Sequence, residues 1–347
     1  MKILFNKILV LSMFLFVGCS GSDDGDSGDV NGGGEPVVSS LQVFISAEEV
    51  IVGSTVLFSV FDNNGKNRTS EAKFYVNDSE TSGSSHTFND VGTFEVYAKL
   101  QNVKSQTEDI IVNPVPIEYK KYVLVEDYTG TWCGYCTRVS YAIEQLEKET
   151  NDAVIIAIHQ GDPIAFGQVN SLMSSFGVTG FPTALIDRAT RWTYPEPSNI
   201  SQVTGKLSKK SYAALAMESS LDGDMLTIKV KLKMGYNYQA LKLGLYILED
   251  GLVYDQRNWT SYYQGDPIVD FEHHNVLRKA VTGLLGDQIP SDKVGHDKEF
   301  EKEFQYVIPA SFNKENIKMV AFVTEGNDKE AINVRSSKIG ESQIFEK

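Results

Sequence analysis

The sequence predicts a multidomain protein in which a central α/β domain lies between two β-sandwich domains of immunoglobulin-like outline. Two cysteines, Cys133 and Cys136, stand between an apolar, β-branched run and a helical pattern. Residues 40–113 and the chain from 212 onward instead alternate apolar and polar side chains, as strands with one buried face do. The 347 residues, 41% of them hydrophobic and 22% charged, suffice for two or three globular domains.

The N-terminus has the pattern of an export signal. Lys2 and Lys7 precede an apolar run, 8–17, that is too short to span a bilayer stably. The run ends at Gly18-Cys19, which resembles the cleavage site of bacterial lipoproteins. The resemblance implies that residues 1–18 are a signal peptide and that Cys19 becomes the lipid-attachment residue, where several acyl chains give a stable membrane anchor. Secretion with a free Cys19 is the alternative.

Residues 19–39 are polar and acidic, which predicts a disordered tether. Asp23, Asp24 and Asp26 resemble the surface-export signal of Bacteroidetes lipoproteins. This resemblance implies a protein anchored in the outer membrane, on the cell surface rather than on the periplasmic face; a merely solubilising tether is the alternative. The net charge of −14 is not offset by a basic stripe, which argues against a nucleic-acid partner.

The first predicted domain covers residues 40–113. Short strands are expected at 41–46, 55–61, 72–76, 93–99 and 108–112, with a hairpin turn at 63–65. Their spacing fits a small β-sandwich without an inter-sheet disulfide. It carries no recognisable chemistry and is predicted to be a spacer or adhesive module. Pro114 and Pro116 then mark a domain boundary.

The α/β domain is expected at 117–210. Apolar residues recur at three- and four-residue spacing over 139–146, which predicts a helix that starts near Cys133. In the first turn of a helix the exposed N–H groups lower the pKa of a thiol, and Cys136, one turn later, could resolve a mixed disulfide. A structural disulfide, half of a zinc site and chance are the alternatives. Zinc is disfavoured because no second cysteine pair supplies the remaining ligands.

A second motif, Gly180-Phe181-Pro182-Thr183, precedes the apolar run 184–186. Together with the cysteine pair it resembles the thioredoxin superfamily, so 117–210 is expected to have a thioredoxin-like fold. The resemblance implies that Pro182, 49 residues after Cys133, follows a cis peptide bond and lies against the cysteines. An ordinary trans turn is the alternative. The residues expected to contact a substrate are Trp132, Gly134, Tyr135, Phe181 and Thr183.

Asp127 precedes Cys133 by six residues, and the resemblance makes it the candidate proton acceptor for Cys136. Burial would raise its pKa towards neutrality, which suits that role. Because side chains alternate along a strand, only one of Glu126 and Asp127 can face the cysteines, and Asp127 is preferred. A solvated carboxylate at a strand end is the alternative. The remaining elements are expected at 154–159 (strand), 164–176 and 198–207 (helices) and 191–194 (strand).

Residues 211–347 are expected to form a second antiparallel β-sandwich, with strands at 228–234, 241–248, 304–308 and 317–324. His273 and His274 form the only adjacent histidine pair. Neighbouring side chains on a strand point in opposite directions, so the two cannot bind one metal ion there, and a structural or interface role is predicted. No metal or cofactor is implied.

The order of these parts resembles the Bacteroidetes outer-membrane lipoproteins related to the twenty-eight-kilodalton outer membrane protein. The matching stretches are 125–133 and 274–278, and the resemblance covers 117–347. That family name states a location and no reaction, and its members do not all keep both cysteines. A redox function for this chain is therefore inferred from Cys133 and Cys136 alone.

Two functions remain open. One is a thiol–disulfide oxidoreductase whose partners are exported or cell-surface protein substrates or a redox partner protein. The other is an adhesin or binding subunit in which the disulfide is structural. The sequence does not distinguish an oxidase, an isomerase and a reductase, because the reduction potential depends on the surroundings of the thiolate.

Overall fold

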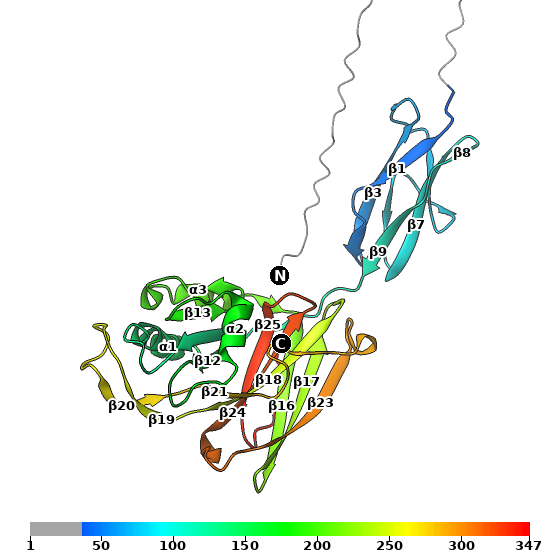
Figure 1. The fold of residues 1–347 in the computed structure, drawn as a ribbon. Helices are drawn as coiled ribbons and strands as arrows, with labels where there is room; N and C mark the ends of the chain where they lie inside the picture. Colours follow the sequence, from blue (N-terminus) through cyan, green and yellow to red (C-terminus); the bar gives the residue numbers. More distant parts are fainter. Residues whose placement is uncertain (1–36) are drawn as a thin grey trace, which may run out of the picture. The chain divides into compact units, whose positions relative to one another are not determined.

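A computed structural model describes residues 37–347, which divide into two compact units, one ending at Val115 and one running from Pro116 to Lys347 (Figure 1). The predicted signal peptide, Cys19 and the tether up to residue 36 lie outside the described residues.

The N-terminal unit consists of two β-sheets around one apolar core. One sheet has the strand order β1-β3-β6, and the other has the order β2-β9-β7-β4-β5 with β8 beside β7. Val56, Phe58 and Val60 of β3 point into the core, as the alternation predicts. The immunoglobulin-like outline stays a prediction. The strands are β1 Leu41–Ile45, β2 Glu49–Ile51, β3 Thr55–Asp62, β4 Lys73–Val76, β5 Ser79–Glu80, β6 Ser85–Thr87, β7 Gly92–Leu100, β8 Val103–Lys104 and β9 Glu108–Asn113.

The second unit is built on a nine-stranded mixed sheet with the order β14-β13-β11-β12-β21-β18-β24-β25, and β22 beside β18. Its first four strands come from the predicted α/β domain: β11 Val123–Thr129, β12 Ala153–His159, β13 Thr183–Ile186 and β14 Thr190–Arg191. The others come from the C-terminal region: β18 Leu241–Glu249, β21 Val276–Ala280, β22 Asp287–Gln288, β24 Ile317–Glu325 and β25 Ala331–Lys338.

The two regions join where β12 and β21 run parallel, with Ala157 opposite Val276 and the Ala157 N–H donating to the Asn275 carbonyl at 2.8 Å. The boundary predicted between residues 210 and 211 therefore falls inside one compact unit. The two regions join because β12 is apolar on both faces, as an interior strand of a sheet is, and its second edge therefore needs a neighbouring strand.

Helices cover both faces of the α/β part of this sheet. On one face Val123 and Val125 pack with Val139 and Leu146 of α1. On the other face Leu124 and Tyr128 pack with Leu172 of α2. The bounds are α1 Thr137–Glu149, α2 Val169–Phe176, α3 Ser201–Leu207 and the 3-10 turn η1 Glu196–Ser198.

A three-stranded sheet, β16-β17-β23, packs over the C-terminal half of the large sheet. Ile228 and Val230 of β17 share this core with Leu245 of β18 and Ala321 of β24. Two β layers are thus present here, but one of them continues the α/β sheet instead of belonging to a separate β-sandwich domain. The remaining elements are β10 Tyr119–Lys120, β15 Lys210–Ser211, β16 Ala213–Asp222, β17 Met225–Met234, β19 Leu252–Gln256, β20 Ile268–His273, β23 Glu299–Val307, and the 3-10 turns η2 Ser291–Lys293 and η3 Lys314–Asn316.

Two predicted helices are shorter than expected. The helix expected from residue 164 begins at Val169, because the Asp162 carboxylate accepts the Ile164 N–H and residues 160–168 fold as turns. The closing helix begins at Ser201 after η1. The short strand expected at 191–194 is β14, Thr190–Arg191, paired with β13.

Candidate active site at the cysteine pair

Cys133 and Cys136 form a disulfide between the end of β11 and the start of α1. Both residues are buried, with 5% and 1% of their surface exposed. Cys136 is the residue that caps α1, which begins at Thr137. The prediction that the helix starts near Cys133 is therefore wrong by about one turn.

The late start of α1 has a physical cause. In a helix the carbonyls of Cys133 and Gly134 would accept N–H groups four residues later. Here the Gln256 side chain donates to the Cys133 carbonyl at 3.1 Å, and the Trp259 N–H donates to the Gly134 carbonyl at 2.7 Å. The helix begins after these diverted carbonyls. That a helix terminus lowers the pKa of the Cys133 thiol stays a prediction.

Gln256 and Trp259 belong to a strap, residues 256–267, that links the hairpin strands β19 and β20. The strap lies alongside the cysteine loop. The Arg257 N–H donates to the Thr131 carbonyl at 2.8 Å. The Trp259 ring covers Gly134 so closely that a Cβ at position 134 would lie 2.3 Å from it. The strap explains why a glycine stands between the cysteines.

The strap also contacts the first turns of α1 through polar groups. Asn258 and Thr260 share hydrogen bonds with the buried Thr137 hydroxyl at 3.0 Å. The Tyr263 hydroxyl donates to Glu144, about two turns further along the helix. These contacts were not predicted, because partners about 120 residues apart leave no local pattern in the sequence.

Asp127 is buried, with 2% of its surface exposed, and it lies on the sheet face that α1 covers. Its Oδ1 has no hydrogen-bond partner within residues 37–347. Burial raises the pKa of Asp127 to about 8; the negative charge of Glu196 adds to this rise and Arg138 opposes it. Glu126 points to the opposite face, where Arg188 contacts its carboxylate at 2.6 Å. The two side chains therefore lie on opposite faces, as the alternation predicts, whereas the preference for Asp127 as the residue that faces the cysteines stays a prediction.

The Phe181–Pro182 bond is cis, as the sequence predicts. Thr183, the next residue, begins β13 and pairs with Tyr128 of β11. The Phe181 ring meets the Trp132 ring edge-on, with centroids 5.4 Å apart. The proline turn therefore lies beside the cysteine loop.

Three aromatic side chains border the cysteine loop and stay exposed: Trp132 by 45%, Tyr135 by 52% and Trp259 by 57%. The Tyr135 and Trp259 rings meet edge-on at 5.3 Å. Trp132 is fixed by a hydrogen bond from its indole N–H to the Gln160 carbonyl at 2.7 Å. Apolar surface of this kind suits contact with another polypeptide. Trp132 and Tyr135 were predicted, whereas Trp259 was not.

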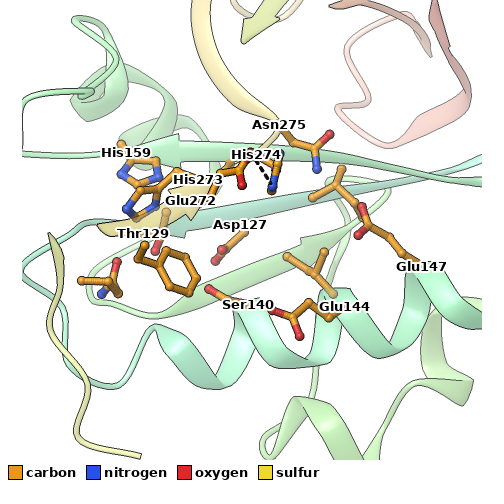
Figure 2. A pocket seen from close by; sticks show the side chains of 15 residues that line it. Asp127, Thr129, Ser140, Glu144, Glu147, His159, Glu272, His273, His274 and Asn275 are labelled. Carbon is orange, nitrogen blue, oxygen red and sulfur yellow. Dashed lines mark ion pairs between the residues drawn. The ribbon is translucent and has the colours of Figure 1, made fainter. Parts of the chain in front are cut away.

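A cavity of about 80 Å³ lies between β11, β12, α1 and the end of β20 (Figure 2). Its lining includes Asp127, Ser140, His159 and His273. Figure 2 shows the Asp127 carboxyl in the space between the strands and α1, and the rings of His159 and His273 side by side, with centroids 5.1 Å apart.

The histidine side of this cavity is linked to the cysteine loop. His159 contacts Asp162 at 2.7 Å, and Asp162 accepts the Thr131 N–H at 2.9 Å. Burial alone would raise the pKa of Asp162, but these hydrogen bonds hold it below its usual value. Within residues 37–347 no three His, Cys, Asp or Glu side chains are placed to hold a metal ion.

The predicted pair His273 and His274 separates in the structure. His273 is 6% exposed, whereas the His274 side chain is 53% exposed and lies 3.6 Å from Glu272. Burial lowers the pKa of His273 to about 4; repulsion from His159 adds to this, and a hydrogen bond with the Tyr254 backbone opposes it.

A disulfide between strand and helix, a buried carboxyl beneath the helix and a cis-proline turn beside them define a thioredoxin-like domain. The family model for thioredoxin matches residues 102–213. A second model, described as outer membrane protein Omp28, matches residues 169–343, slightly more than half of the chain. The chain belongs to the Omp28 family of outer membrane proteins, and the predicted resemblance is confirmed.

Two solved structures are similar to the chain. HBP35 of Porphyromonas gingivalis is 20% identical and has a TM-score of 0.52, with 64% of this chain and 76% of HBP35 covered; this likeness shows the fold alone. A domain of the outer membrane lipoprotein Omp28 from Porphyromonas gingivalis is 22% identical, with a TM-score of 0.26, 38% of this chain and 89% of that domain covered. No curated protein matches the chain. No helix in the described part of the chain is long and apolar enough to cross a membrane.

Proposed function

We propose that this protein is a thiol–disulfide oxidoreductase that acts on exported or cell-surface proteins through Cys133 and Cys136. One observation carries the proposal. The buried Asp127 carboxyl, with one unpaired oxygen, lies on the sheet face that is covered by the helix beginning after Cys136. A purely structural disulfide needs no buried carboxyl near it, and burying one without a partner costs free energy. Such costs are tolerated where the group has a chemical task.

The reaction starts from the reduced protein. The Cys133 thiolate attacks one sulfur of a substrate disulfide, that disulfide breaks, and one substrate sulfur leaves as a thiolate. A mixed disulfide now joins Cys133 to the substrate. The ionised form of Asp127 takes the proton of the Cys136 thiol, and the Cys136 thiolate attacks the Cys133 sulfur. The second substrate sulfur leaves with its electron pair. Two electrons have passed from the cysteine pair to the substrate disulfide, and the reverse sequence oxidises a substrate dithiol.

Trapping of the mixed disulfide tests this function. The variant Cys136→Ser keeps the attacking thiol but lacks the resolving one, so exported proteins should remain covalently bound to Cys133 and be released by reductant. Cys133→Ser is the matched control and should trap none. Equal, negligible trapping by both variants would contradict an exchange reaction.

The alternative function is an adhesin or binding subunit with a structural disulfide. The observation in its favour is the low exposure of both cysteines beneath the strap. In that case the disulfide should resist reduction by thiols in the folded protein, and the trapping experiment would give no adducts.

We further propose that a lipid on Cys19 anchors the protein in the outer membrane with its domains on the cell surface. Membership of the Omp28 family supports the outer membrane. Cys19→Ser should release the protein from the membrane fraction, whereas Cys133→Ser should not. Protease added to intact cells should degrade the anchored protein; protection until the outer membrane is opened would place it on the periplasmic side.

A further inference from the structure

Two buried polar atoms share the cavity between β11, β12, α1 and the end of β20, and each lacks a partner among the described residues. Asp127 Oδ1 and His273 Nε2 each lack a hydrogen-bond partner within residues 37–347, and both residues line this cavity (Figure 2). Asp127 comes from β11 and His273 from the end of β20, so the thioredoxin-like part and the C-terminal part each contribute one. Buried polar groups are normally paired, with protein or with ordered water.

The cavity is large enough for water and reaches the surface. A water needs about 10 to 15 Å³ of such volume and several polar partners, so about 80 Å³ holds a short chain of them. Asp127, which lines it, is 2% exposed. Glu272 and His274 line it as well, and their side chains are 59% and 53% exposed.

The two unpaired atoms are chemically complementary at neutral pH. Burial keeps Asp127 protonated, with its pKa raised to about 8, and keeps His273 neutral, with its pKa lowered to about 4. A protonated carboxyl donates a hydrogen bond and the unprotonated Nε2 accepts one, so water in the shared cavity can pair with both.

The charged groups around this pair come from every neighbouring element. Facing Asp127 are Glu196 after β14 and Arg138 of α1, which form an ion pair. Near His273 are the His159–Asp162 pair and the adjacent His274, whose ring lies 3.6 Å from Glu272. The carboxylates that line the cavity from α1 are Glu144 and Glu147.

We propose that His273 is a positioning residue that holds a chain of water between Asp127 and the surface, and that the proton taken from Cys136 leaves along it. The inference rests on the proposed thiol–disulfide exchange. Asp127, which is protonated at neutral pH, first releases its proton through the water to the solvent. The resulting carboxylate takes the proton of the Cys136 thiol and releases it by the same path, and no electrons move in these steps. His273 acts through the water that its Nε2 orders and touches no substrate.

The first test is independent of the exchange reaction. Asp127 is titrated by carboxyl ¹³C NMR in the disulfide form of the full chain, solubilised in detergent. His273→Phe keeps a ring but removes the acceptor and dries the cavity, so the charged carboxylate loses solvation and the pKa of Asp127 should rise by about one unit or more. His273→Asn keeps an acceptor and should stay near the wild-type value. His86→Phe, in the N-terminal unit, is the control. An unchanged Asp127 titration in His273→Phe would overturn the proposal.

The second test follows the resolving step with glutathione disulfide as the probe. Stopped-flow mixing with the reduced full chain separates the second-order attack by Cys133 from the first-order release of glutathione by Cys136. His273→Phe should slow only the release, by about tenfold at neutral pH, and His273→Asn should restore it. In an Asp127→Asn background His273→Phe should add nothing, because both changes interrupt one path.

The outcomes separate the two proposals. Multiplicative losses in the double variant, or equal release rates in His273→Phe and the wild type, would contradict the water path. If the wild type never releases glutathione, the proposed exchange function fails, and the Asp127 titration alone decides whether the cavity carries the water chain.

Discussion

At the scale of single residues, the position of Asp127 in β11 determines its proposed chemical role. Alternation along β11 was enough to predict that Asp127 and Glu126 face opposite sides. In the structure Glu126 pairs with Arg188, whereas Asp127 Oδ1 has no hydrogen-bond partner in the part of the chain that the structure describes. The cavity beside it was not predictable. His273, which also lines the cavity, is 146 residues away from Asp127 in the sequence, and no local sequence pattern predicts that the two residues share a cavity.

The raised pKa of Asp127 predicts a pH-dependent stability. An unfolded aspartate has a pKa of about 3.9, and the folded one has a pKa of about 8. Below pH 4 both states hold the proton. As the pH rises towards 8 the unfolded state loses its proton first, so the free energy of unfolding falls, by an amount on the order of 5 kcal/mol.

Asp127→Asn removes this titration. In denaturant unfolding of the oxidised protein between pH 4 and 9, the variant should gain stability relative to the wild type as the pH rises, and the two should be closest at pH 4. Parallel curves for the two proteins would show that Asp127 titrates normally.

At the scale of elements, the strap shapes the cysteine loop. Sequence periodicity located α1 through its buried residues, but it placed the start of the helix too early. The reason is that residues of the strap, which is distant in the sequence, donate hydrogen bonds to the Cys133 and Gly134 carbonyls. Local patterns report a helix's buried face better than its ends, where distant groups compete for the backbone.

Gly134→Ala tests the fit of the strap. The added methyl would overlap the Trp259 ring at 2.3 Å, so the strap must shift, and the free energy of unfolding should fall by about 1 to 3 kcal/mol. Trp259→Gly in the same chain should relieve most of this loss. Gly180→Ala, where no atom lies within 4 Å of the new methyl, is the matched control and should change little. Additive losses for Gly134→Ala and Trp259→Gly would show that the two residues are not packed together.

At the scale of the whole molecule, the second unit is held together across the β12–β21 junction. The stretch 274–278, singled out from the sequence for its family resemblance, forms this junction, with Asn275 accepting from Ala157 and Val276 opposite it. Behind it the buried Arg188 bridges Glu126 of β11 and the Tyr246 hydroxyl of β18. The sequence predicted the strands on both sides, but the pairing between them required the three-dimensional structure.

A fragment of residues 117–210 should therefore not fold by itself. It would expose the edge of β12 and lose the apolar cover that Tyr246, Leu248 and Phe322 give to the sheet. The comparison is residues 116–347, which should unfold in one cooperative transition by circular dichroism. A cooperative, native-like transition in the short fragment would show that the α/β part is an independent domain.

The central claim is that Cys133 and Cys136 exchange disulfides with protein substrates. The most direct measurement is the catalysed reduction of insulin disulfides by the full chain with dithiothreitol as the electron source. The wild type should accelerate the reduction, Cys133→Ser should give only the uncatalysed rate, and Asp127→Asn should fall between them because its resolving step is slowed. A wild-type rate equal to that of Cys133→Ser would contradict the claim and favour a structural disulfide.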